Sequence, residues 1–374
     1  MTIGILKEMG TENRVAFLPE HLAALSKVSF DTILLEAGAG AQSFQTDKAY
    51  EEAGASITDR STVLEKADVV VTIDAADLEG LRSNSILITQ MNPLSNTDKV
   101  ESYKSKGLSV FSMDMVPRTT KAQAMDVLSS MATSSGYKAI LTAASLLPRF
   151  FPMFMTAAGT IAPAKVLILG AGVAGLQAIS TARRLGAVVE AFDVRAAAKE
   201  EVLSLGAKFV EVEGSTDDTS AGGYAVEQTE EYKLKQAALI QEHALKSDVI
   251  VCTAQIPGRI APLLVKEETV KAMKPGSVII DLAASTGGNA AFTENGKTIQ
   301  AHGVTIVGES NLPSTIPSDS SKMYGKNLIN FLNECVVDGQ ISFDFENEII
   351  QHSCITHKGE IISPRVIKKI SQSS

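Results

Sequence analysis

Short apolar runs rich in β-branched residues alternate with helix-like segments along almost the whole chain. Alternation at this spacing is typical of a parallel sheet covered by helices, because parallel neighbours need a long crossover connection. The alternation occurs in two series. The first predicts strands at residues 2–8, 31–38, 69–73, 85–91 and 109–113. The second predicts strands at residues 165–170, 188–194, 208–213, 248–254, 277–283 and 304–309.

The second series has the strand number of a complete dinucleotide-binding fold, so we interpret it as a domain inserted into the first. Long helices predicted over about 121–147 and 319–337 flank it. A hairpin and a polar tail are expected after the second helix. The sequence therefore predicts an α/β protein with two Rossmann-like, doubly wound parallel-sheet domains joined by long helices. Residues 128–312 form the inserted domain, and residues 1–127 with 313–374 form the other.

Charge and composition exclude several classes of function. The chain has 34 Lys and Arg against 43 Asp and Glu, a net charge of −9, which argues against binding a nucleic-acid backbone. Its cysteines and histidines form no CxxC, HxxH or HExxH pattern, so no metal site is predicted. The most apolar stretch, 166–182, is short for a bilayer span of roughly 20 residues. The N-terminus lacks the pattern of a secretory signal, and we expect a soluble, cytoplasmic chain.

A glycine-rich turn stands where the second series begins. The segment LILGAGVAGLQAI places Gly170, Gly172 and Gly175 directly after a strand and at the start of a helix. Such glycines permit a tight turn, close approach of a pyrophosphate and close packing of helix on strand, while the helix N-terminus offers free N–H groups. Asp193 ends the next strand, where an acid would bind the adenine ribose or else cap a helix. A carboxylate there favours NAD(H) over NADP(H), although Arg195 nearby weakens that preference.

Two further segments could contact a bound nucleotide. Thr253, Ala254 and Gln255 follow a strand, and their small neighbours would let a cofactor lie close to the backbone; ordinary loop chemistry is the alternative. Residues 213–229 form a long polar excursion in which Gly223 and Tyr224 could act as a hinge and a closing ring. A surface insertion is the alternative interpretation.

The stretch 118–130 combines polar groups of several kinds. If a helix begins near Lys121, then Gln123, Asp126 and Ser129 share one face, with Arg118 at its entrance. A solvated helix start is the alternative. No residue stands out as a proton acceptor beside a nicotinamide, which an alcohol or amino-acid dehydrogenase requires. Direct hydride transfer between two nicotinamides needs only two rings held face to face without water.

Over nearly its whole length the chain resembles the NAD(H)-binding component, domain I, of proton-translocating nicotinamide nucleotide transhydrogenase, in the version made as a separate alpha-1 subunit. The matching stretches are 118–130 (RTTKAQAMDVLSS), 151–179, 183–209, 221–225 (AGGYA), 256–258 and 274–289. Alanine dehydrogenase is also similar, including the Arg14-Val-Ala element. Its active site has a lysine in a VKVKEP-like strand and a histidine in a YLHLA-like motif. The matching stretches here, 69–75 and 87–93, contain neither.

The resemblance implies a role for individual residues. Arg118, Gln123 and Asp126 match the loop that positions the dihydronicotinamide, and Ser129 matches a serine that contacts the carboxamide. Gln255 stands where the family more often has leucine. The cofactor-binding positions predicted from the residues and the resemblance together are Gly170, Gly172, Val173, Gly175, Asp193, Val194, Arg195, Gly223, Tyr224, Gln236, Thr253, Ala254 and Gln255.

The implied activity is Si-Re specific hydride transfer from NADH on this chain to NADP⁺ on a separate domain III, coupled to proton passage through a membrane domain II. The resemblance also implies that the chain forms a homodimer. The membrane and NADP(H)-binding domains would be other polypeptides, and they would hold the dimer against the inner face of the membrane. No metal is expected. The alternatives are an amino-acid oxidoreductase like alanine dehydrogenase, and an NADH-binding regulatory module without enzymatic activity.

Overall fold

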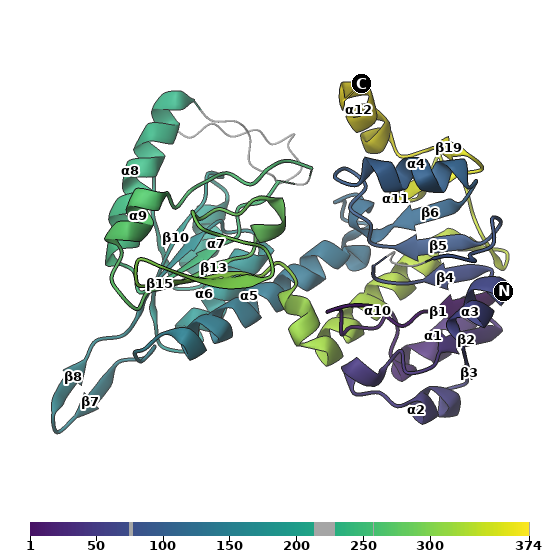
Figure 1. Ribbon diagram of the computed structural model, residues 1–374, viewed down its shortest axis with the longest axis horizontal. Helices are drawn as coiled ribbons and strands as arrows, with labels where there is room; N and C mark the ends of the chain where they lie inside the picture. Colours follow the sequence, from purple (N-terminus) through teal and green to yellow (C-terminus); the bar gives the residue numbers. More distant parts are fainter. Residues whose placement is uncertain (75–77, 213–228, 257, 374) are drawn as a thin grey trace. The chain divides into compact units, whose positions relative to one another are not determined.

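The computed structural model describes residues 1–74, 78–212, 229–256 and 258–373 (Figure 1). The chain divides into two compact units. Unit 1 comprises Met1–Met131 and Pro313–Ser374, and unit 2 comprises Ala132–Leu312. The boundaries of independently folding domains at 1–127 with 313–374 and at 128–312 stay a prediction. Each unit is built around one large sheet.

The sheet of unit 1 has eight strands in the order β19-β18-β6-β5-β4-β1-β2-β3. Six strands are parallel, and they follow the Rossmann order 3-2-1-4-5-6. A hairpin adds two antiparallel strands beside β6. The parallel strands are β1 (Thr2–Ile5), β2 (Thr32–Glu36), β3 (Ser56–Thr58), β4 (Val69–Val71), β5 (Ile86–Thr89) and β6 (Ser109–Ser112). The hairpin strands are β18 (Cys354–His357) and β19 (Glu360–Ile361).

Helices cover both faces of this sheet because successive strand residues are buried on opposite sides. Ile33 and Leu35 belong to the core that includes α1, α10 and α11, whereas Leu34 belongs to the core that includes α3, α4 and α12. The helices of unit 1 are α1 (Leu22–Lys27), α2 (Asp47–Glu52), α3 (Arg60–Lys66), α4 (Thr97–Ser105), α10 (Pro317–Cys335), α11 (Glu348–Ser353) and α12 (Pro364–Ser373). A small hairpin, β16 (Val336–Val337) with β17 (Gln340–Ile341), follows α10.

The sheet of unit 2 repeats the same plan. Its order is β11-β10-β9-β12-β13-β15-β14, in which the first six strands named are parallel and again follow 3-2-1-4-5-6. The seventh strand, β14, is antiparallel to β15. The bounds are β9 (Lys165–Leu169), β10 (Val188–Phe192), β11 (Lys208–Phe209), β12 (Val249–Cys252), β13 (Val278–Asp281), β14 (Lys297–Ala301) and β15 (Val304–Gly308).

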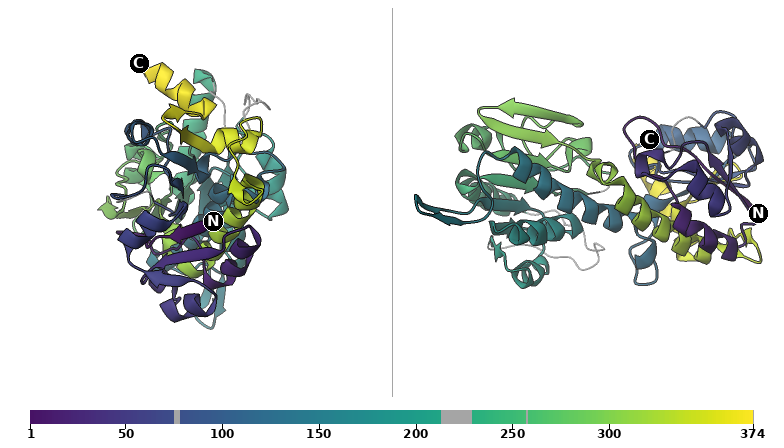
Figure 2. Two further views of the ribbon diagram at one scale, coloured as in Figure 1. Left: turned by 90° about the vertical axis from the view of Figure 1, so that its right-hand side faces the viewer. Right: turned by 90° about the horizontal axis from the view of Figure 1, so that it is seen from below.

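Alternation along β9 again divides two buried layers. Val166 and Ile168 contact the layer of α5, α6 and α7, and Leu167 and Leu169 contact the layer of α8 and α9. Figures 1 and 2 show these helices on the two sides of the sheet. A separate hairpin of two strands, β7 (Phe154–Thr156) and β8 (Gly159–Ile161), extends away from the sheet of unit 2. The helices are α5 (Val127–Leu146), which begins in unit 1, α6 (Val173–Arg184), α7 (Ala198–Ser204), α8 (Glu230–Lys246) and α9 (Glu267–Ala272).

The predicted fold class is confirmed, and three local predictions are wrong. The helix expected from about residue 121 is a 3₁₀ turn, Gln123–Met125, followed by α5 from Val127. The expected polar tail is the helix α12, whose Val366 is fully buried. The strands β3, β7, β8 and β14 lie outside the ranges that the sequence predicts. Among the described residues, no helix has the length and apolarity needed to cross a bilayer.

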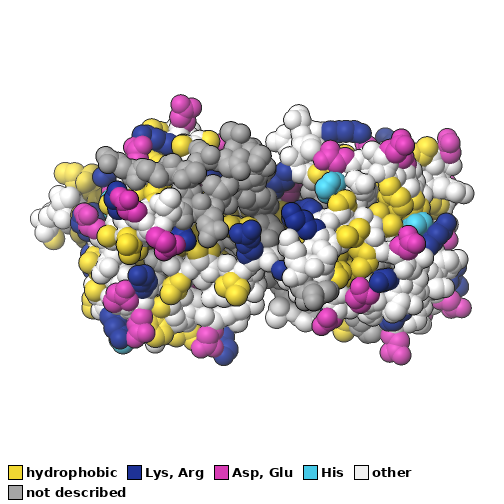
Figure 3. Space-filling view, turned by 90° about the horizontal axis from the view of Figure 1, so that it is seen from above, with side chains coloured by type: hydrophobic (Ala, Val, Ile, Leu, Met, Phe, Trp, Pro, Cys, Tyr) yellow, Lys and Arg dark blue, Asp and Glu magenta, His cyan; other side chains and the backbone are white. Residues whose placement is uncertain are grey.

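Charges of both signs are distributed over the surface. Across the face shown in Figure 3, Lys and Arg side chains are interspersed with Asp and Glu side chains. Many are paired at one helical turn, as in Lys48–Glu52 and Lys271–Glu267.

Candidate functional site

The strand order of unit 2 creates one preferred ligand position. The chain leaves β9 for β10 on one side, while β12 lies on the other side of β9. In open α/β sheets, ligands bind beyond the carboxyl ends of the strands at such a switch point. Gly170 directly follows β9, and Thr253 directly follows β12. The fold therefore brings the predicted glycine turn and the predicted segment 253–255 to the same sheet edge.

The three glycines of the turn differ in what a side chain would meet at each position. Gly170 has φ 101°, a left-handed conformation, and a Cβ there would lie 2.5 Å from Thr253 Oγ1. A Cβ on Gly175 would lie 1.9 Å from the carbonyl oxygen of Gly170, so glycine is required for α6 to pack on this strand end. A Cβ on Gly172 would meet nothing within 4 Å. Gly172 precedes α6 and supplies no side-chain cap, which leaves the first N–H groups of α6 for an anion.

Asp193 holds the glycine turn from the neighbouring strand. It directly follows β10, and its side chain is only 7% exposed. One carboxylate oxygen accepts the Ala171 N–H at 2.7 Å. The other accepts the Arg195 backbone N–H at 2.8 Å, and the Arg195 guanidinium pairs with both oxygens. Asp193 does not cap α7, since the residue before that helix is Ala197. Binding of a ribose by Asp193 remains a prediction, for which its oxygens have further lone pairs. Val194 is half-buried beside this pair.

The segment after β12 is held by hydrogen bonds within the protein. The Thr253 hydroxyl donates to the Gly170 carbonyl oxygen at 2.8 Å. The Ala254 N–H donates to the Asn289 side-chain oxygen at 3.0 Å, and the Asn289 amide donates back to the Ala254 carbonyl at 2.9 Å. Gln255 is exposed and donates to the Thr286 hydroxyl at 3.2 Å. Of the three, Gln255 alone has an exposed side chain at this edge.

Three further nucleotide contacts are predicted at Gln236, Gly223 and Tyr224. Gln236 is a half-buried residue in the first half of α8, and no hydrogen bond within the described part of the chain joins it to the glycine turn. Gly223 and Tyr224 lie outside the described residues.

The stretch 118–130 belongs wholly to unit 1, and it differs from the predicted helical face. Asp126 stands immediately before α5, where its carboxylate accepts the Ser129 N–H at 2.9 Å and the Ser129 hydroxyl at 2.6 Å. The side chain thus caps α5, which begins at Val127. Gln123 opens the preceding 3₁₀ turn and is exposed. Arg118 lies near the same carboxylate, with Nε 3.9 Å from Asp126 Oδ2.

Buried neighbours fix this turn. Ala122 and Met125 are buried in the core of unit 1. Asn327 and Asn330 on α10 donate their side-chain N–H groups to the Ala124 carbonyl at 2.8 and 3.0 Å. These contacts hold the turn in place. It presents the exposed amide of Gln123, the partly exposed guanidinium of Arg118 and the hydrogen-bonded pair of Asp126 and Ser129. Such groups can orient a polar planar ligand such as a carboxamide.

The switch point of unit 1 is filled by a carboxylate that the sequence reasoning missed. Glu8, after β1, accepts the Ile73 N–H at 2.6 Å, the Asp74 N–H at 3.0 Å and the Thr72 hydroxyl at 2.8 Å after β4. Burial raises the pKa of Glu8 to about 7, and these hydrogen bonds oppose the rise. Nearby, Arg14 forms a buried bidentate pair with its neighbour Glu12. An acid three residues after an apolar strand is the sequence signal that could have indicated this.

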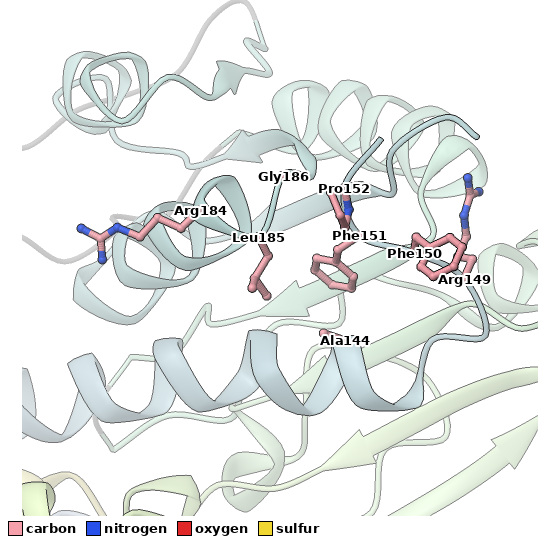
Figure 4. Close-up of a pocket in the computed structure, with 8 residues that line it drawn as sticks. All are labelled: Ala144, Arg149, Phe150, Phe151, Pro152, Arg184, Leu185 and Gly186. Atoms are coloured by element: carbon pink, nitrogen blue, oxygen red, sulfur yellow. The ribbon is translucent and has the colours of Figure 1, made fainter. Parts of the chain in front are cut away.

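One hollow of unit 2 lies away from the glycine turn. It has a volume of about 490 Å³ and lies at the far end of α6, beside Arg184, Leu185 and Gly186. Figure 4 shows the ring of Phe151 above Ala144 of α5, and the guanidinium of Arg184 pointing away. The remaining lining residues are Arg149, Phe150 and Pro152. No group of three or more His, Cys, Asp or Glu side chains in the described ranges could hold a metal ion.

The fold and the glycine turn together define a dinucleotide-binding α/β protein. Family models match both parts of the chain: alanine dehydrogenase/PNT, N-terminal domain, over residues 4–135, and alanine dehydrogenase/PNT, C-terminal domain, over residues 139–364. The chain therefore belongs to the alanine dehydrogenase/PNT family.

Individual relatives separate the two branches of that family. The chain is 43% identical to a protein of Rhodospirillum rubrum named as the first part of NAD(P) transhydrogenase subunit alpha, covering 97% of this chain and 98% of that protein. It is 26% identical to alanine dehydrogenase of Bacillus subtilis, covering 99% and 95%. The crystal structure of transhydrogenase from Sinorhizobium meliloti matches with a TM-score of 0.88 at 43% identity, over 97% of this chain and all of that one. The resemblance to transhydrogenase, with alanine dehydrogenase as a relative, is confirmed, as is the class of nucleotide-binding oxidoreductase.

Proposed function

We propose that this chain is the NAD(H)-binding subunit of a proton-translocating transhydrogenase, and that it holds NADH for direct hydride transfer to NADP⁺ on a separate domain III. The observation that carries the proposal is the glycine turn at the switch point of unit 2. A relative named as belonging to a transhydrogenase alpha subunit matches nearly the whole chain, and this match supports the same function.

The turn fits a dinucleotide on three grounds. Gly172 leaves open space where a side chain would stand, and the N-terminus of α6 beside it lacks a side-chain cap. The helix dipole there favours a diphosphate. Asp193 supplies a carboxylate that can accept ribose hydroxyls and would repel a 2′-phosphate. These residues would hold NAD(H), with Val173 and Val194 forming apolar walls and Arg195 the edge of the adenosine site.

The nicotinamide end is assigned to the turn before α5. We propose that Arg118, Gln123, Asp126 and Ser129 position the dihydronicotinamide and its carboxamide. When bound, NADH supplies the hydride. The protein contributes orientation and exclusion of water, because hydride transfer between two nicotinamides leaves no hydroxyl or amine proton to remove. Gly223, Tyr224, Gln236 and Gln255 remain proposed contacts of the nucleotide.

The partners are also proposals. The Rhodospirillum relative is named as one piece of a subunit, which supports membership in a larger assembly. We propose that domains II and III are other polypeptides, that proton passage occurs in domain II, and that the chain is peripheral to the inner face of the membrane. A homodimer is supported by the β7–β8 hairpin of unit 2, whose Phe154, Met155 and Ile161 are 41%, 76% and 40% exposed.

Alanine dehydrogenase activity is the second candidate, because members of that branch share the family. The stretches 69–75 and 87–93, which match its lysine and histidine motifs, contain neither residue. An NADH-binding regulatory module without catalysis is the third candidate. It shares the turn but predicts no hydride exchange with any partner.

The deciding experiment mixes the purified chain with a purified NADP(H)-binding domain III and follows hydride transfer from NADH to an NADP⁺ analogue by absorbance. Transfer that requires both proteins supports the proposal. Asp126→Asn is the matched variant, since asparagine also caps helices and the fold should be retained. Alanine-dependent NAD⁺ reduction by the chain alone, measured at 340 nm, would favour the second candidate. NADH binding without transfer would favour the third.

A further inference from the structure

A buried asparagine brackets one residue at the edge of the candidate nucleotide site. Asn289 is fully buried in unit 2. Its side-chain oxygen accepts the Ala254 N–H at 3.0 Å, and its amide donates to the carbonyls of Ala254 at 2.9 Å and Pro262 at 2.8 Å. Both backbone polar groups of Ala254 are therefore engaged by one side chain, much as a neighbouring strand would engage them.

A buried carboxylate holds this asparagine in place. Asp281, the last residue of β13, is fully buried. One of its oxygens accepts the N–H groups of Asn289 at 2.6 Å and Ala290 at 2.9 Å, together with the Thr293 hydroxyl at 2.8 Å. Gly288 permits this approach, since a Cβ there would lie 2.8 Å from the same oxygen. The loop after β13 is thus folded around the Asp281 side chain.

The same contacts continue to the glycine turn. Ala254 follows Thr253, whose hydroxyl donates to the Gly170 carbonyl oxygen at 2.8 Å. That oxygen is also the atom nearest to the missing Cβ of Gly175. A shift of Ala254 would therefore move the Thr253 hydroxyl, and with it the Gly170 carbonyl against which α6 packs.

We propose that Asn289 is a positioning residue for nucleotide binding, which acts through Ala254 and Thr253 to fix the Gly170 turn. The inference rests on the proposed function, since it concerns the same NADH site. Because the N–H and carbonyl of Ala254 already bond to Asn289, Ala254 would contact the nucleotide only through van der Waals packing. Thr253 serves the nucleotide through its bond to Gly170.

The test measures NADH affinity of the full chain by the fluorescence of the dinucleotide, which is favoured here because the sequence contains no tryptophan. We expect Asn289→Ala and Thr253→Val each to raise the dissociation constant about tenfold, the scale of one lost hydrogen bond with its partner left unpaired. The double variant should have about the same dissociation constant as the more strongly affected single variant, because both changes act on one path.

Asp248→Ala is the matched control. Asp248 is also nearly fully buried in unit 2, but it lies at the opposite sheet edge, directly before β12. It accepts the Lys165 N–H at 2.8 Å and the Arg149 guanidinium at 2.9 Å. Its loss should lower the unfolding temperature without changing the NADH dissociation constant of the folded protein. The same pattern in Asn289→Ala would show a purely structural role and overturn the inference.

Each remaining outcome either supports or overturns the role proposed for Asn289. Fully additive effects in the double variant would overturn the proposed path. If Asn289→Ala does not fold, Asn289→Asp keeps the volume and one acceptor while removing both N–H donors, and an unchanged affinity there overturns the inference. If neither variant folds, wild-type affinity in Thr253→Val overturns it, whereas a tenfold loss that Thr253→Ser restores supports it. A wild-type chain that binds no NADH would reject the proposed function itself, and this inference with it.

Discussion

Glu8→Gln tests how strongly the interior of unit 1 resists a negative charge. Glu8 is 7% exposed and lies where three donors from Thr72, Ile73 and Asp74 converge. Burial raises its pKa from 4.5 to about 7, so desolvation outweighs those hydrogen bonds. Glutamine has nearly the same shape as the protonated acid and never ionises.

The sign of the expected effect follows from proton binding. Between pH 4.5 and about 7 the folded chain retains a proton on Glu8 that the unfolded chain has lost, so the free energy of unfolding falls as the pH rises through this window. At about 1.4 kcal/mol per pH unit, the full difference is roughly 3 kcal/mol. The glutamine NH2 group cannot accept the backbone N–H that faces one of the two Glu8 oxygens, and this cost does not depend on pH. Relative to the wild type, the free energy of unfolding of Glu8→Gln should therefore rise by up to that amount between pH 4.5 and about 7.

The assay is urea unfolding followed by far-ultraviolet circular dichroism at several pH values from 4.5 to 8. Other groups near Glu8, which include Glu12, Arg14, Asp114 and Tyr324, remain in both proteins and cancel to first order in the comparison. Glu51→Gln on the exposed side of α2 controls for the loss of one charge. A difference between wild type and Glu8→Gln that stays constant across this range would refute the reasoning.

Four further substitutions test the two predicted parts of the site. Gly175→Ala places a methyl group 1.9 Å from the Gly170 carbonyl oxygen, so both the unfolding temperature and NADH affinity should fall; wild-type values for both would contradict the packing of α6. Gly172→Ala meets no neighbour within 4 Å, so the unfolding temperature should hold while NADH affinity falls, and calorimetry with a ligand titration separates the two. Asp126→Asn and Arg118→Ala should each slow hydride transfer about 100-fold in stopped-flow mixing with domain III, with little change in NADH affinity. Rates equal to the wild type would remove this turn from the proposed chemistry.

The parts of the fold that could be predicted from the sequence are those with a local signal. The runs at 165–170 and 248–254 are continuous and apolar because both faces of the sheet are covered, and they correspond to β9 and β12. Gly170 and Gly175 could be assigned a role from their spacing, since close packing between strand and helix requires residues without side chains.

The start of α5 could not be predicted, because contacts distant in the sequence decide it. Residues 121–125 (KAQAM) favour a helix by propensity. In the structure Ala122 and Met125 are buried in the core, and Asn327 of α10 binds the Ala124 carbonyl. These tertiary contacts, together with capping by Asp126, outweigh the local preference.

The hydrogen bond from the Ala171 N–H to Asp193 could not be predicted for a similar reason. The motif assigns the acid to a ligand, and no spacing rule shows that it also ties the turn to the next strand. Asn289 ends a small, glycine-containing segment after the strand predicted at 277–283, and the sequence can place that segment at the same sheet edge. Its hydrogen bonds to Ala254 could not be predicted, because they depend on the register between β12 and β13.

Two sheets with the same strand order offer a comparison within one chain. Both follow 3-2-1-4-5-6, and each has a switch point between its first and fourth parallel strands. In unit 1 the Glu8 carboxylate fills that edge and consumes the N–H groups of Ile73 and Asp74. In unit 2 Gly172 leaves open space before α6, and the carboxylate of Asp193 accepts the Ala171 N–H of the turn. Since strand order is common to both, the turn chemistry must decide which sheet binds a dinucleotide, and it favours unit 2.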